Sequence, residues 1–171
     1  MSVFIGQVVV STELMNKVVK PLILNQQSVL SDIEFRVDRG AITFRARGKY
    51  FVQFRAEGAA RIISFNFGPG GHNLTLAVEI KLYPRVLDLF ARNPLEIIFA
   101  GQPGMRIKGT IMQIDLREVP WVASIGKTPV GGADIFSWLE VAFAGKSEAG
   151  LLFNFSLAEH AMTPQQEPAG N

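Results

Sequence analysis

Strict alternation of apolar and polar residues is the feature that most constrains the fold of this chain. The longest run extends from Leu74 to Leu82, where every second residue is Leu, Val or Ile. The same period of two extends over Ile33–Val37 and Ile42–Ala46. Because successive side chains of a strand point to opposite faces, these runs predict half-buried antiparallel strands that share one apolar face. Glycine-containing segments at residues 38–40, 48–49, 58 and 68–73 predict the turns of a meander.

Three segments carry helix signals. After a short strand at 3–10, Ser11 or Thr12 is a candidate N-cap, and apolar residues then recur at helical spacing until Pro21, which ends or kinks the helix. Pro84 suits the first turn of a second helix, Arg85–Arg92. For a third helix at 134–144, Asp134 is the expected N-cap and Gly145 the glycine that stops it.

The remaining segments complete the fold prediction. Strands are expected at 95–100, at 105–119 with a β-bulge near residues 110–112, and at 151–157, with a loop over 120–132. The predicted fold class is α+β: a curved, mainly antiparallel sheet, arranged as a meander, with two to three packed helices. One domain is expected over residues 1–160, followed by a flexible polar tail at 161–171.

Composition narrows the class of protein. The chain of 171 residues is 48% hydrophobic and has 13 phenylalanines, which suffices for a packed core. It has no cysteine, which excludes disulfides, thiolate metal sites and a cysteine nucleophile. The first residues lack the basic start of a signal peptide, and no apolar run is long enough to span a membrane, so a cytoplasmic protein is expected.

Two short segments resemble the end of a phosphate-binding P-loop: Gly126-Lys127-Thr128 and Gly145-Lys146-Ser147. A P-loop needs a further glycine five residues earlier, where backbone amides approach the phosphates. Those positions hold Trp121, which blocks the approach, and Glu140, which repels the anion. The chain is therefore not expected to be a nucleotide hydrolase.

Other catalytic signals are weak. The histidines are His72, in a glycine-rich loop, and His160, near the tail, and no serine follows the G-x-S-x-G pattern of hydrolases. No pair of carboxylates is spaced as an acid/base couple. We expect a non-catalytic protein with no metal and no cofactor, and we rank an enzyme below binding and structural roles.

Charge is uneven along the chain. Between Glu34 and Arg117 there are 13 Lys/Arg and 7 Asp/Glu, so the middle is basic although the whole chain carries only +2. A basic sheet binds single-stranded nucleic acid when aromatic rings lie among the basic residues. Here Phe35 and Phe44 share the parity of the aliphatic residues, whereas Arg45 has the other parity. Nucleic-acid binding through the basic sheet face is therefore a disfavoured alternative.

The predicted helix at 134–144 is apolar around most of its circumference, since only Asp134, Ser137 and Glu140 are polar. Such a helix is buried on more than one side, or it contacts a partner, a lipid or a membrane surface. The preferred hypothesis is a groove between sheet and helices that binds a hydrophobic or amphipathic ligand, such as a lipid, without catalysis. The alternative is a structural protein that uses this helix as an interface with a second copy or another partner.

The candidate ligand-binding residues come from all parts of the chain. The apolar candidates are Leu14, Val18, Phe44, Phe65, Leu76, Phe136, Trp138 and Phe143. Three basic residues, Arg45, Arg47 and Lys49, are candidates for binding an anionic headgroup at the rim of the groove.

The segment STELMNKVVKPLIL, followed by IEFRVDRGAITFRARGKY and several long alternating strands, covers about Ser11–Tyr83, or as far as Val119. This order of elements resembles the bacterial TULIP-like lipid-binding proteins. The resemblance implies a helix packed along a strongly curved antiparallel sheet around an apolar tunnel for lipid. It implies no catalytic motif and no role for any single residue, because the lining positions of that group are defined by shape. Many members are exported or lipid-anchored, whereas no signal sequence is recognisable here.

Overall fold

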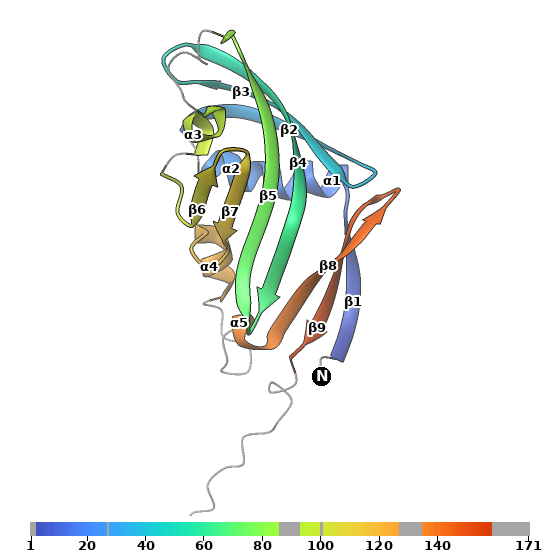
Figure 1. The fold of residues 1–171 in the computed structure, drawn as a ribbon. Helices are drawn as coiled ribbons and strands as arrows, with labels where there is room; N and C mark the ends of the chain where they lie inside the picture. The colour runs from blue at the N-terminus through green and yellow to red at the C-terminus, as the bar shows by residue number, and fades with distance from the viewer. Residues whose placement is uncertain (1–2, 27, 86–92, 100, 127–134, 159–171) are drawn as a thin grey trace, which may run out of the picture.

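The computed structural model describes residues 3–26, 28–85, 93–99, 101–126 and 135–158 of the chain (Figure 1). Within these residues, an antiparallel sheet of nine strands is accompanied by short helices, which is an α+β architecture. The strands are β1 (Val3–Val10), β2 (Leu30–Asp38), β3 (Ala41–Lys49), β4 (Gln53–Gly68), β5 (Gly71–Tyr83), β6 (Met105–Lys108), β7 (Ile111–Asp115), β8 (Leu139–Ser147) and β9 (Gly150–Leu157). The helical segments are α1 (Thr12–Leu14), η1 (Met15–Val19), α2 (Lys20–Asn25), α3 (Pro94–Phe99), α4 (Pro120–Gly126) and α5 (Ile135–Trp138).

Two long strands, β4 and β5, form the centre of the sheet and pair from Arg55↔Tyr83 to Gly68↔Gly71. The other edge of β4 has two successive neighbours, first β3 and then β8, which meets β4 at Phe67. The sheet therefore divides into a hairpin wing, β2–β3, and a three-stranded wing, β8–β9–β1 (Figure 1). On its far side β5 pairs with β7, which pairs with β6.

The strands predicted from alternation are present. β2 and β3 are joined at Arg39 and Gly40, whose φ angles of 46° and 80° identify a tight hairpin turn. β5 contains the run from Leu74 to Leu82, and the strands predicted at 3–10 and 151–157 correspond to β1 and β9. For β2, β3 and β5 the alternation therefore identified both the strand and the face that its apolar side chains occupy.

Gly58 is not the predicted corner, because β4 runs through it. A Cβ at this position would overlap the carbonyl oxygen of Glu79 and the ring of Phe44. The glycine therefore makes room for the Phe44 ring against the backbone of the central strands. The turn expected at 48–49 comes slightly later, at residues 50–52.

The predicted first helix is present, and Ser11 Oγ caps it by accepting a hydrogen bond of 3.2 Å from Leu14 N–H. Pro21 does not end it, since α1, η1 and α2 follow one another without a break. In η1, a π-helical turn, Lys20 N–H donates to Met15 O, one residue further back than in an α-helix. Because proline lacks an N–H and its ring clashes with the carbonyl four residues earlier, a widened turn before Pro21 lets the helix continue.

The predicted helix at 134–144 is wrong. Of its described residues only Ile135–Trp138 is helical, and the chain then continues as β8, while the expected N-cap Asp134 lies outside the described residues. The apolar residues of β8 alternate with small or polar ones, and they pair with apolar residues of β9. Pairing with a strand later in the chain therefore outweighs the local preference of leucine and alanine for helix. Gly145, with a φ of 125° at a register shift, marks a bulge in β8 and not a helix end.

Three further expectations are wrong. The strand expected at 95–100 is helix α3, for which Asn93 Oδ1 accepts a hydrogen bond of 3.0 Å from Leu95 N–H at its start. The strand expected at 105–119 is the hairpin β6–β7, and the expected bulge is its turn at Gly109, where φ is 60°. The expected loop begins with helix α4. The predicted helix Arg85–Arg92 lies, apart from Arg85, outside the described residues.

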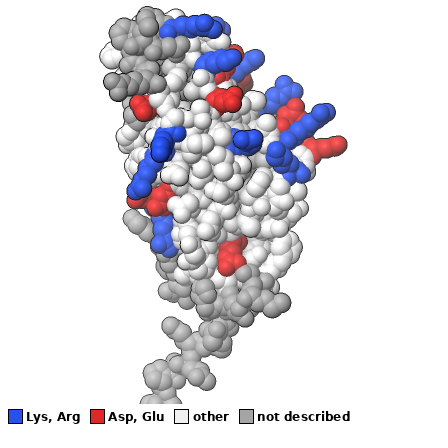
Figure 2. Space-filling view, in the orientation of Figure 1, with Lys and Arg blue, Asp and Glu red and all other residues white. Residues whose placement is uncertain are grey.

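The core lies on one face of the sheet, the apolar face, where Ile33, Phe35, Phe44, Val78 and Leu82 are buried. Helical side chains cover it, namely Met15, Leu95, Ile97, Ile98 and Phe136. The alternate residues of the same strands form the opposite, polar face. Figure 2 shows charged side chains gathered toward the end of the molecule that holds the hairpin wing, whereas the lower part of this view is largely uncharged.

Candidate functional site

The helix that joins β1 to β2 takes the place of a strand at the outer edge of β2. Thr12 Oγ1 accepts a hydrogen bond of 2.8 Å from Val37 N–H and donates one of 3.2 Å to Val37 O. Asn16 repeats the arrangement one turn later: its Oδ1 accepts from Phe35 N–H at 2.9 Å and its Nδ2 donates to Phe35 O at 2.7 Å. Four residues of helix advance about 6 Å and two residues of strand about 6.7 Å, which is why the two spacings match.

A third contact of the same helix face is ionic. Lys20 Nζ lies 2.7 Å from Asp32 Oδ1, one turn beyond Asn16. The hydrogen bond from Lys20 is the main cause that lowers the pKa of the Asp32 carboxyl, and the positive charge of Arg47 adds to it. Thr12, Asn16 and Lys20 therefore fix the helix along β2.

The other flank of this helix is apolar and only partly covered. Met15 and Val19 pack against the core, whereas Leu14 is half-buried and Val18 is 47% exposed. Leu14 and Val18 each follow a β2-binding residue by two positions, about 200° around the helix. They therefore face away from the hairpin wing.

An aromatic cluster lies on the apolar face of the three-stranded wing. The ring of Phe153 in β9 lies 5.2 Å from that of Phe65 in β4 and 5.5 Å from that of Phe143 in β8. Val8 of β1 is the register partner of Phe153 and is exposed. The three rings are half-buried, so this part of the apolar face is incompletely covered. Phe155, two residues along β9, extends the same surface.

A second aromatic group is packed inside the protein. The buried Phe136 ring lies 5.3 Å from Phe67 and 5.0 Å from His72, and the Arg117 guanidinium lies 5.7 Å from its centroid. Phe136 thus fixes α5 over the ends of β4 and β5 that are joined by their turn. The next helical residues end at Trp138, whose carbonyl accepts from Ala158 N–H at 2.7 Å.

The predicted apolar candidates do not form one cluster. Phe65 and Phe143 meet through Phe153, and Leu14 and Val18 share a helix flank. Phe136 belongs to the interior, and Phe44 is buried in the hairpin wing. Leu76 is half-buried on β5, between its partners Ile62 and Met112, and Trp138 ends α5.

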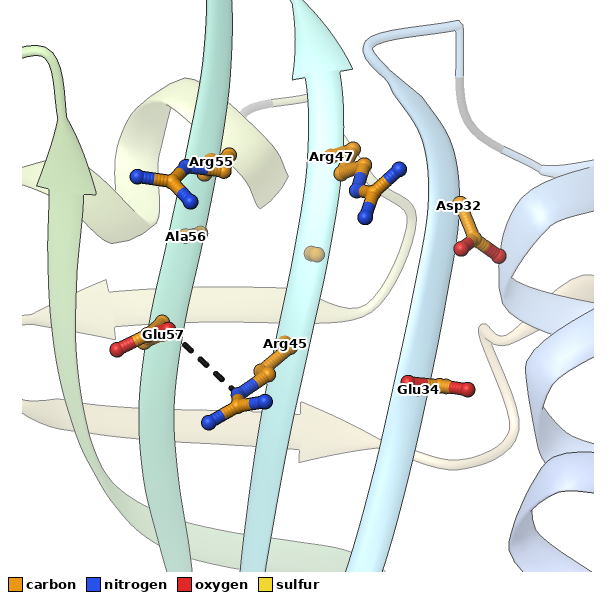
Figure 3. A pocket seen from close by; sticks show the side chains of 8 residues that line it. Asp32, Glu34, Arg45, Arg47, Arg55, Ala56 and Glu57 are labelled. Carbon is orange, nitrogen blue, oxygen red and sulfur yellow. Dashed lines mark ion pairs between the residues drawn. The ribbon is translucent and has the colours of Figure 1, made fainter.

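The basic candidates lie on the polar face, opposite the Phe44 ring of the same strand β3. Arg45 Nε lies 3.5 Å from Glu57 Oε1, which Figure 3 shows as a pair across β3 and β4. A shallow hollow of about 180 Å³ is bordered here by Asp32, Glu34, Arg45, Ala46, Arg47, Arg55, Ala56 and Glu57 (Figure 3). Its three carboxylates and three guanidiniums balance, so the hollow as a whole has no net charge. Arg45 in particular is neutralised by its neighbour.

β1 is also an edge strand of the sheet, and its residue types differ from those at the edges formed by β2 and β6. Among the described residues no strand pairs with its outer edge. It has no charged residue and no proline, and five of its apolar side chains are exposed: Val3, Phe4, Ile5, Val8 and Val9. By contrast, helix side chains cover the edge of β2, and the short β6 carries Arg106 and Lys108, which discourage pairing with another chain.

Sequence reasoning missed this edge and the turn at 50–52. Both had a signal in the residue types. VFIGQVVV is long and uncharged for an edge, and the turn after Lys49 consists of Tyr50, Phe51 and Val52 instead of the usual turn residues. Neither signal can be interpreted as exposure until the positions of the neighbouring strands are known.

Within the described residues, no helix is both long and apolar enough to cross a membrane. The same residues contain no group of three or more His, Asp or Glu side chains placed to hold a metal ion. No protein-family model, curated protein or solved structure matches this chain.

Proposed function

We propose that the protein binds a hydrophobic or amphipathic ligand, by preference a lipid with an acyl chain, on the apolar face of the three-stranded wing. The observation that supports this most directly is the half-buried cluster of Phe65, Phe143 and Phe153 beside exposed Val8. A contiguous apolar surface that stays in contact with water is typical of a ligand or partner site.

The helix would supply the second wall of this site. Leu14 and Val18 lie on the flank that faces away from β2, and hydrogen bonds from Thr12 and Asn16 hold that flank in a fixed orientation. An acyl chain between a curved sheet and this helix would agree with the resemblance to TULIP-like proteins. No charged side chain occupies the central positions of the wing's apolar face, so the favourable term would be apolar burial.

The test is binding of fatty acids of increasing chain length. Native mass spectrometry of protein purified from cells should reveal a bound lipid. In titrations with fatty acids, the Kd should fall about fourfold per added methylene while each added carbon becomes buried. A protein that carries no lipid and binds no fatty acid would contradict the proposal.

Two faces of the same wing provide matched variants. Phe153→Ser should weaken fatty-acid binding at least about tenfold, since it removes the ring that joins the other two. Val8→Ser, on the same face but exposed, should weaken it with less effect on folding. Phe4→Ser is the control, because Phe4 pairs with Ser156 on the polar face. Equal losses for Phe4→Ser and Phe153→Ser would show that the apolar face is not the site.

The β1 edge favours a second candidate function, self-assembly. Residues 139–144 form a strand, so the helical interface that the sequence suggested there does not exist. The outer edge of β1 takes its place as the candidate interface. Two copies related by a two-fold axis would pair β1 with β1 in antiparallel fashion, which satisfies the backbone groups of both edges and covers their apolar side chains. Because β1 is uncharged, no repulsion opposes the approach of a second copy.

Sedimentation velocity tests this candidate. The wild type should be dimeric, and the double variant Ile5→Lys/Val9→Lys should be monomeric, because it places charges on the edge strand. Val18→Lys, which adds one charge at an exposed position of the helix, should remain dimeric. A wild-type monomer at high protein concentration would exclude pairing through β1.

A further inference from the structure

The turn between β3 and β4 presents three apolar side chains to solvent. Phe51 is 70% exposed, the largest exposure among the large hydrophobic residues that the structure describes, and Tyr50 and Val52 are 47% and 43% exposed. The Tyr50 and Phe51 rings pack edge to face with centroids 4.3 Å apart. This turn lies at the end of the molecule remote from the three-stranded wing (Figure 1).

Basic residues surround the turn. Lys49 precedes it, and Arg47 and Arg55 lie on the two strands just behind it, with no acidic residue between positions 47 and 55. Two carboxylates of the polar face lie near these residues, but their ion pairs are with other cations, Asp32 with Lys20 and Glu57 with Arg45. Among the described residues, Lys49, Arg47 and Arg55 form no ion pair.

Arg47 and Arg55 are direct cross-strand partners in the register of β3 and β4. Like charges at opposed positions destabilise a sheet, so this pair is unfavourable for the isolated protein. In Figure 3 the two guanidiniums lie on the polar face and point in different directions. Arg55 extends toward the Tyr83 ring at 6.0 Å from its centroid. Asp32 is the register partner of Arg47 on β2, but its ion pair is with Lys20, so two adjacent cations that form no ion pair remain available to an external anion.

We propose that the turn of residues 50–52 docks the protein on an anionic lipid bilayer. Phe51 and Val52 enter the boundary between headgroups and acyl chains, Tyr50 remains at the headgroup level, and Arg47, Lys49 and Arg55 contact lipid phosphates. Aromatic side chains prefer this interface, and each basic residue near an anionic surface strengthens binding about fivefold. Charge complementarity selects a bilayer over an apolar protein partner. The apolar tip, residues 50–52, matches the boundary with the acyl chains, and the basic collar of Arg47, Lys49 and Arg55 matches the lipid phosphates.

Docking by this turn is separate from ligand binding on the three-stranded wing, and either can fail alone. It would, however, place a lipid-binding protein at a source of its ligand. The two sites are tested by different variants and different probes.

The experiment is co-sedimentation with vesicles of two compositions: phosphatidylcholine alone, and equal parts of phosphatidylcholine and phosphatidylglycerol. Wild-type protein should bind the anionic vesicles on the order of 100-fold more tightly, and raised salt should weaken this binding. Equal binding to both compositions, or no binding to anionic vesicles at low salt, would overturn the proposal.

Variants separate the tip from its collar. Phe51→Ser/Val52→Ser should reduce binding to anionic vesicles more than tenfold, and Arg47→Gln/Arg55→Gln should do so while removing most of the salt dependence. Ile63→Ser, which changes an exposed apolar residue elsewhere on β4, should bind as the wild type does. If the tip variant bound vesicles as tightly as Ile63→Ser, the turn would not be the docking site.

Two further measurements test whether the turn enters the bilayer and whether a different polyanion is the true partner. Phe51→Trp should retain vesicle binding, and vesicles of brominated phospholipid should quench its fluorescence more than that of the wild type, which contains Trp121 and Trp138; a tip outside the bilayer would show no such difference. Single-stranded oligonucleotide is the competing polyanion. If the protein bound oligonucleotide but not anionic vesicles, and only the arginine variant lost this binding, the bilayer proposal would be wrong. Phe153→Ser should lose fatty-acid binding and keep vesicle binding.

Discussion

The side-chain amide of Asn16 forms two hydrogen bonds with the backbone of Phe35, as a neighbouring strand would do. An asparagine is suited to this because its side chain carries one acceptor and one donor group, like a peptide unit. The edge of β2 is thereby closed by a helix instead of a strand. This relationship holds the helix against the hairpin wing and leaves its apolar flank available.

Asn16→Ala should therefore lower the free energy of unfolding by about 2 kcal/mol, because two partly buried backbone groups of β2 lose their partners. Urea denaturation followed by circular dichroism measures it. Lys17→Ala is the control: its ion pair with Glu13 is highly exposed, so the change should be less than about 0.5 kcal/mol. Equal effects of the two variants would mean that the amide contacts contribute little.

Gly58→Ala should destabilise the protein by about 1–3 kcal/mol, because the added methyl group overlaps both a carbonyl oxygen of β5 and the Phe44 ring. Gly6→Ala in β1 is a matched strand position, with no heavy atom within 4 Å of the new methyl group. It should be neutral or slightly stabilising. Thermal unfolding of both variants distinguishes a steric requirement from a general preference for glycine in these strands.

Arg39→Asn should stabilise the β2–β3 hairpin by up to about 1 kcal/mol. Arg39 has a φ of 46°, a conformation that asparagine adopts more readily than arginine, and Gly40 follows it. Asn-Gly is the preferred pair for this turn. Gly40→Ala should have the opposite effect, since its φ is 80°. A fall in the midpoint of thermal unfolding for Arg39→Asn would contradict the assignment of the turn.

The Lys20–Asp32 contact predicts a pH dependence of stability. The pKa of Asp32 in the folded protein lies below its ordinary value of about 3.9, because Lys20 stabilises the carboxylate. Its contribution to stability is therefore fully present above pH 3.9 or so and is lost as the pH falls through the lower folded value. The stability difference between wild type and Asp32→Asn should exist at neutral pH and close in acid.

Urea midpoints measured from neutral pH to about pH 2 test this dependence. Both side chains are partly exposed, so the difference should be modest and should shrink in high salt. Lys20→Met should remove the same pH-dependent component, because it deletes the donor. A difference that persisted unchanged in strong acid would show that the Asp32 charge is not its origin.

Local pattern was sufficient for β2, β3 and β5, because alternation and turn residues are encoded within a few positions of each other, but it wrongly divided β4 at Gly58. It failed where the partner is distant. Leu139–Ser147 has leucine and alanine at helical spacing, and only contact with β9 and β4 selects the strand. Pro94–Phe99 is a different case: the apolar run suits either structure, and a local signal, the Asn93 cap, marks the helix start.

The candidate site was predictable only in part. Phe65 and Phe143 were identified as apolar candidates, but their connection through Phe153 depends on the order of strands β4, β8 and β9. Parity correctly separates Arg45 and Arg47 from Phe44. However, the two arginines were expected at the rim of the ligand groove, whereas in the structure they lie on the polar face of the sheet, opposite the apolar face. Exposure of β1 and of the turn at 50–52 follows from the absence of neighbours, which no local pattern records.

The Gln7 amide donates to Asn154 Oδ1 at 2.9 Å across 147 positions of sequence. During synthesis β1 is made more than a hundred residues before β9, the strand that covers its inner edge. Until β9 emerges, β1 therefore lacks the strand that pairs with it, and the three-stranded wing cannot close. A nascent chain of this protein would depend on chaperones or on slow elongation to keep VFIGQVVV from joining a neighbouring copy too soon.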